Sequence, residues 1–182
     1  MPASHLTRLA LLPGIVLHEL SHYYFCRLAG AQVHEVRFFS FGYPPGYVIH
    51  TAPRRFRAHC VIVLGPLLIN SAVALALFCV AVATGRELAG LDPIDWAPGV
   101  LRLALAGWLG LVAGLQALPS SGDAVSLWQV AKWHLRNGNP LVVVAYPVAL
   151  LIQLTNWLRG MWIDWLYAGL LLWAAFGLTG RG

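Results

Sequence analysis

The sequence contains very little charge. Only 10% of its 182 residues are charged, whereas 59% are hydrophobic and the mean hydropathy is +0.69. Soluble domains usually carry about 25% charged residues. So few charges do not cover a water-exposed surface, which excludes a soluble globular enzyme, a disordered chain and a typical nucleic-acid-binding protein. We therefore expect an all-α polytopic membrane protein, because a helix satisfies its own backbone polar groups in lipid.

Cysteine is also scarce. The three cysteines, Cys26, Cys60 and Cys79, are odd in number, lie within or beside apolar runs and form no C-x-x-C pair, which argues against both a disulfide framework and a thiolate metal site. The net charge of +5 comes from dispersed basic residues with one cluster at 54–57. In a membrane protein such a cluster sets topology, so it does not indicate a nucleic-acid partner.

Five apolar runs predict five membrane spans within a single transmembrane domain, residues 1–182. The runs cover residues 6–29, 58–84, 100–118, 141–157 and 161–178. A span needs about 20 residues to cross a core of about 30 Å, so the short last two runs leave four spans as an alternative. The first run is expected to be retained rather than cleaved, because no small-residue cleavage site precedes its polar residues.

The longest polar stretch, residues 31–57, is predicted to form a short β-hairpin at the membrane surface. Residues 33–41 are rich in β-branched and aromatic side chains, residues 42–46 read Gly-Tyr-Pro-Pro-Gly, and residues 47–49 supply a return strand.

The basic residues predict the orientation in a cell membrane. Loops 31–57 and 119–140 carry positive charge, whereas loop 85–98 is acidic. Because positive loops stay inside, the hairpin and the C-terminus are expected in the cytoplasm and the N-terminus outside.

The motif H-E-x-x-H occurs inside the first apolar run, as His18, Glu19 and His22. Residues four apart lie on one face of a helix, so both imidazoles can reach one metal ion. Zinc accepts imidazole nitrogen and lowers the pKa of water, so the neighbouring carboxylate of Glu19 can take its proton. The alternative is a polar cluster between packed helices without a metal.

A catalytic zinc site usually has three protein ligands, so another segment must supply the third. The candidates are His59, Asp123 and Asp164. His59 and Asp164 also suit the membrane interface. Asp123 follows a Pro-Ser-Ser-Gly break and has two open roles: a metal ligand, or the N-cap of a helix over residues 124–136.

The sequence resembles the site-2 protease family of intramembrane zinc metalloproteases. The likeness rests on the motif at 18–22, the Gly-Pro pair at 65–66, Asn70, Pro119 and Asp123. It covers roughly residues 10–130. In the second family motif, usually N-x-x-P with L-D-G following, this chain has Gln116 in the Asn position, and Ala rather than Gly follows the aspartate.

The resemblance implies Zn²⁺ as cofactor, held by His18, His22 and Asp123, with Glu19 activating water. It implies cleavage of a peptide bond in or near a transmembrane segment of a membrane-protein or peptide substrate. The hairpin is expected to bind the unwound segment by β-addition or only to close the helix ends, and both roles stay open. Asn70 is expected either to bind substrate or loop backbone or to pack helices.

A second function class remains open: a protease-like membrane protein that binds zinc or client helices without cutting. A membrane di-iron oxidase is disfavoured, because such enzymes need repeated histidine groups and this chain has one pair. The oligomeric state is not predicted.

Overall fold

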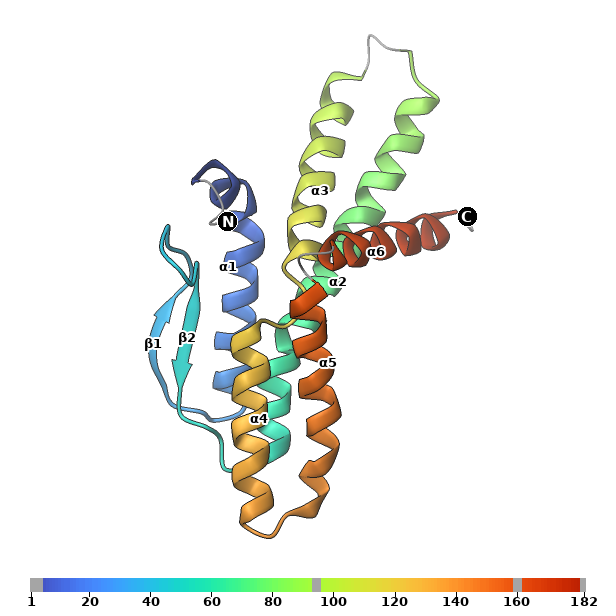
Figure 1. Ribbon diagram of the computed structural model, residues 1–182. Coiled ribbons are helices and arrows are strands. Elements are labelled where there is room, and N and C mark those ends of the chain that lie inside the picture. Colours follow the sequence, from blue (N-terminus) through green and yellow to red (C-terminus); the bar gives the residue numbers. More distant parts are fainter. Residues whose placement is uncertain (1–4, 93–95, 159–161, 181–182) are drawn as a thin grey trace.

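The computed structural model describes residues 5–92, 96–158 and 162–180. Helices and one small hairpin account for its regular structure (Figure 1). The elements in chain order are α1 (His5–Leu28), β1 (Val33–Arg37), β2 (Tyr47–His50), α2 (Phe56–Ala89), α3 (Ala97–Leu115), α4 (Ser121–Arg136), η2 (Pro140–Val144), α5 (Ala145–Leu158) and α6 (Ile163–Thr179).

Helix α2 is the central element. Its 34 residues extend over about 51 Å, which is longer than the hydrocarbon core of a bilayer. One end packs against α4 and α5 through a cluster around Val63 and Leu127. Its middle packs against α3 and α6 around Phe78 and Ala113. Helix α1 lies beside α2 and α3, and both strands of the hairpin contact α1 (Figure 1).

Among the residues that the structure describes, two helices, α2 and α3, are long and apolar enough to cross a membrane, which agrees with a membrane location. A third span is present if α5 and α6, which are bent by 102° relative to each other, count as one. The five predicted spans are therefore not confirmed. Helix α1 is long enough, but His18, Glu19 and His22 lower its mean hydropathy. The start of the predicted fifth span, residue 161, lies outside the described residues.

The predicted hairpin is present and antiparallel. Arg37 pairs with Tyr47 and Val33 with His50, with an irregular register between Val33 and Glu35. The first strand is shorter than expected, because residues after Arg37 bend into the turn. The turn is tied to α1, since the Arg8 guanidinium donates hydrogen bonds to the backbone carbonyls of Phe41 and Gly42.

A glycine sets the distance between α1 and α3. A Cβ added at Gly14 would lie 2.1 Å from the carbonyl oxygen of Val112, which is backbone and cannot rotate away. The two helices therefore approach closely at the level where α3 nears its end. This contact brings the middle of α1 to the loop that precedes α4.

We predict that Gly14→Ala destabilises the protein by about 1–3 kcal/mol, because the added methyl group forces α1 away from α3. The midpoint of thermal unfolding in detergent measures the change. Gly107→Ala on α3 is the control, since a Cβ there meets nothing within 4 Å. Equal midpoints for the two variants would contradict this packing.

Candidate metal centre

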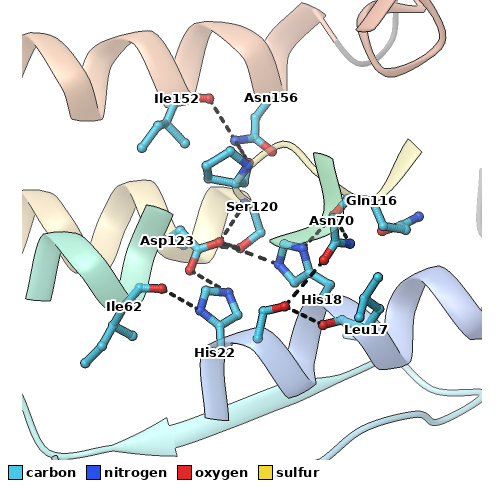
Figure 2. A network of polar contacts seen from close by, with 12 residues as sticks. Leu17, His18, His22, Ile62, Asn70, Gln116, Ser120, Asp123, Ile152 and Asn156 are labelled. Carbon is cyan, nitrogen blue, oxygen red and sulfur yellow. Dashed lines mark hydrogen bonds and ion pairs between the residues drawn. The ribbon is translucent and has the colours of Figure 1, made fainter. Parts of the chain in front are cut away.

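Two histidines of helix α1 place their imidazole rings close together. His18 and His22 are one turn apart, each is 8% exposed, and their ring centroids are 4.9 Å apart. Both rings point toward Asp123 (Figure 2). The helical arrangement predicted from H-E-x-x-H is therefore present, with both histidines buried inside the protein.

Asp123 comes from the first turn of α4. Ser120 is the N-cap of this helix: its hydroxyl accepts a hydrogen bond from the Asp123 backbone N–H at 3.2 Å. In return, Asp123 Oδ2 accepts from the backbone N–H and the hydroxyl of Ser120, both at 2.7 Å. This capping box fixes the carboxylate. Asp123 Oδ1 then lies 3.3 Å from His22 Nε2, and Oδ2 lies 4.0 Å from His18 Nε2.

The orientation of His22 depends on a proline in α2. A helical carbonyl normally accepts from the N–H four residues later, but Pro66 has no N–H to offer Ile62. The freed carbonyl of Ile62 lies 3.0 Å from His22 Nδ1. Because a carbonyl oxygen only accepts, Nδ1 must donate, and the lone pair of His22 is left on Nε2.

The orientation of His18 depends on the end of α3. Its Nδ1 lies 2.7 Å from the carbonyl oxygen of Gln116, the C-cap residue. The same carbonyl accepts from Asn70 Nδ2 at 3.0 Å. Nδ1 of His18 is therefore also a donor, and its Nε2 carries the lone pair. Hydrogen bonds of this kind commonly fix the tautomer of a metal-binding histidine.

The three side chains form a group suited to a metal ion. One nitrogen from each histidine and one Asp123 oxygen lie within 4.8 Å of one another. Ligand atoms of a tetrahedral zinc site lie about 3.3–3.5 Å apart, given bonds of about 2.0–2.2 Å. Two imidazole lone pairs that face a carboxylate repel it, unless a proton or a cation lies between them. The donor set and its spacing therefore fit a metal cation.

The structure distinguishes among the three residues that the sequence offered as a third ligand. Asp123 belongs to the group, whereas neither His59 nor Asp164 does in the described part of the chain. The N-cap role that the sequence left open for Asp123 is wrong: Ser120 is the N-cap, and Asp123 completes the capping box from position N3. Its role as a metal ligand stays a prediction. The helix begins at Ser121, three residues earlier than expected, because Ser120 is the N-cap.

The group opens into a pocket of about 660 Å³. Glu19 lines this pocket together with the three residues of the group. Strand β2 and the turn before it form another part of the wall, where Gly46 lies against the Glu19 side chain. A carboxylate that could act as a base, the group of His18, His22 and Asp123, and strand β2 therefore share one cavity.

Asn70 lies between α1, α2 and the end of α3, and it is not among the described residues that line the pocket. It is fully buried, and its amide faces the carbonyl of Gln116, with those of Gly14 and Ala113 at 3.5 Å. Ser21 Oγ donates to Leu17 O at 2.7 Å. The substrate-binding role predicted for Asn70 stays a prediction, while its contacts are those of a residue that joins helices.

No protein-family model, curated protein or solved structure matches this chain. The likeness to site-2 proteases therefore rests on the motif residues alone. The geometry of the histidine–aspartate group carries the functional argument independently of that likeness.

Sequence reasoning missed the two carbonyls that orient the histidines. The Gly-Pro pair at 65–66 contains the signal for one of them, because a proline within a helix always frees the carbonyl four residues earlier. Nothing in the sequence marks the Gln116 carbonyl, since its freedom depends on where α3 ends.

We predict that Pro66→Ala weakens zinc binding about 10- to 100-fold, the usual cost of losing a hydrogen bond that orients a ligand. The new N–H at position 66 would compete with His22 for the Ile62 carbonyl. Zinc titration of the purified protein in detergent measures the effect. Pro13→Ala, at the other mid-helix proline, is the control and should bind zinc as the wild type does. Unchanged affinity in Pro66→Ala would contradict the assigned role.

Proposed function

We propose that the protein is an intramembrane zinc endopeptidase, which hydrolyses a peptide bond in or near a transmembrane segment of its substrate. The observation that carries this proposal is the convergence of His18, His22 and Asp123 in a pocket that Glu19 also lines. Two imidazoles and one carboxylate are a ligand set of catalytic zinc, and they leave a fourth position open.

Zinc, when bound, would polarise the peptide carbonyl and lower the pKa of water. Glu19 accepts a proton from the attacking water as the new C–O bond forms, and later delivers that proton to the leaving amine as the C–N bond breaks. The Nδ1 hydrogen bonds of His18 and His22 keep their Nε2 lone pairs free of a proton, so these nitrogens would hold the zinc ion. Asp123 would be the third ligand and would supply negative charge to the site.

The hairpin offers a binding place for an unwound substrate. A transmembrane helix hides its peptide bonds in its own hydrogen bonds, so it must be extended before hydrolysis. Strand β1 occupies one edge of β2, and residues of β2 line the pocket. No strand of the described residues pairs with the other edge of β2, so this edge would receive an extended segment by β-addition. The substrate strand would then run past Glu19.

The proposed topology follows the charge distribution. The hairpin and the C-terminus face the cytoplasm, and the N-terminus faces outward. The segment from His22 to Leu28, the last residue of α1, covers about 9 Å of helix, so in this topology His22 would lie within the inner leaflet.

A non-proteolytic zinc protein that binds client helices is the second candidate. The contact between Gly46 and Glu19 favours it, because the turn partly covers the base. Incubating the zinc-loaded protein with a membrane-span peptide separates the two functions. Cleavage that 1,10-phenanthroline stops supports the peptidase, whereas peptide binding without cleavage supports the alternative.

We predict that Glu19→Gln lowers the cleavage rate about 100- to 10,000-fold, the usual contribution of a general base, while zinc stays bound. His22→Ala should lose both zinc and activity, because a ligand is removed. Peptide cleavage and elemental analysis are measured on the same preparations. Retained cleavage in Glu19→Gln would refute this mechanism.

We also predict that Gly46→Ala lowers cleavage about 100-fold without loss of zinc. The new Cβ would lie 2.6 Å from Glu19 Cγ and displace the base, and a displacement of about 1 Å can cost that much. Gly42→Ala in the same turn is the control, since its nearest contact would be at 3.4 Å. Equal cleavage by both variants would show that the turn does not position Glu19.

A further inference from the structure

A second polar pair lies beside the pocket. His59 on α2 is 1% exposed, and its Nε2 lies 3.1 Å from Ser126 Oγ on α4. Within the described residues, His59 Nδ1 is buried and has no hydrogen-bond partner. A buried polar atom without a partner requires a physical explanation, and here it identifies the tautomer of the ring.

Because His59 Nδ1 has no hydrogen-bond partner among the described residues, we assign the proton of the neutral ring to Nε2. If Nδ1 carried the proton, an N–H donor would be buried without an acceptor, which is rare in proteins. With the proton on Nε2, only a lone pair is left without a partner, which costs less. His59 Nε2 therefore donates to Ser126 Oγ.

Because Ser126 Oγ accepts this hydrogen bond, the hydroxyl hydrogen of Ser126 is available to donate to another acceptor. Hydroxyls in helices often donate to the carbonyl four residues earlier, as Ser21, Ser71 and Thr84 do in this protein. Ser126 makes no such bond in the described part of the chain; its hydroxyl is engaged by His59 instead. Ser126 also lines the pocket, about one helical turn after Asp123.

We propose that Ser126 binds the substrate by donating a hydrogen bond to a backbone carbonyl of the extended segment, and that His59 is the positioning residue that sets the direction of this hydroxyl. This inference rests on the function proposed above. Successive carbonyls of an extended segment point to opposite edges. Those directed away from β2 would face α4. His50, at the end of β2, has its ring 6.2 Å from that of His59, so strand and pair flank the same part of the pocket.

Peptide binding to the zinc-loaded, full-length Glu19→Gln protein tests the inference without turnover. The probe is a fluorescent poly-leucine transmembrane peptide with a central Gly-Gly pair, and protein and peptide are reconstituted in phosphatidylcholine vesicles. Adding Ser126→Ala should weaken binding about 5- to 10-fold, the effect of one hydrogen bond. Ser126→Thr, which keeps a hydroxyl, should restore it. Ser71→Ala, which removes a hydroxyl held by Tyr167, is the control and should change nothing.

Variants of His59 separate orientation from packing. His59→Gln places an amide N–H near the position of Nε2 and should retain binding, whereas His59→Leu should weaken it as much as Ser126→Ala does. In the active protein, Ser126→Ala should raise KM and leave kcat nearly unchanged, because the bond forms equally in ground and transition states.

Three results would overturn the inference: no binding of the probe peptide, equal weakening by Ser126→Ala and Ser126→Thr, or ¹⁵N NMR that places the His59 proton on Nδ1. A different result tests the proposed function. If peptide binding depends on the Ser126 hydroxyl but the wild-type protein never cleaves the peptide, the role of Ser126 is supported and the peptidase function is contradicted.

Discussion

The candidate site depends on two backbone carbonyls that the regular helical pattern leaves without their usual partner, one because of Pro66 and one at the C-cap of α3. Those of Ile62 and Gln116 accept the Nδ1 protons of His22 and His18, and so leave both Nε2 lone pairs facing Asp123. Without these acceptors, either ring could turn or change tautomer. The directions of the imidazoles are therefore set by backbone, which moves less than any side chain.

The helix arrangement supplies these carbonyls at the required places. Proline in α2 frees one of them, and the end of α3 frees the other. Gly14 allows α1 to approach α3, and Gly65 makes room for the Phe25 ring of α1 against α2. Asn156 on α5 donates to the Pro119 carbonyl at 3.1 Å, which holds the segment that leads into α4. Helices α2, α3 and α5 therefore help to position the two imidazoles of α1 and the carboxylate of α4.

The sequence predicted the parts of the site that depend on local spacing. His18 and His22 share a helix face because they are four residues apart, and the hairpin follows from its turn residues. Asp123 was one of three candidates, and long-range packing of α4 against α2 and α5 selects it. The number of spans was not predictable, because apolar runs of similar composition form both long helices such as α2 and the 14-residue α5. The hydrogen bond between His59 and Ser126 joins residues that are far apart in the sequence, so no local sequence pattern predicts it.

The most direct test is zinc K-edge X-ray absorption on purified protein that has been equilibrated with zinc and freed of excess metal. The account predicts one tightly held zinc per chain, with two imidazole nitrogens and at least one carboxylate oxygen, and loss of this spectrum in His22→Ala. A protein that retains no zinc, or one whose spectrum is the same without His22, would contradict it.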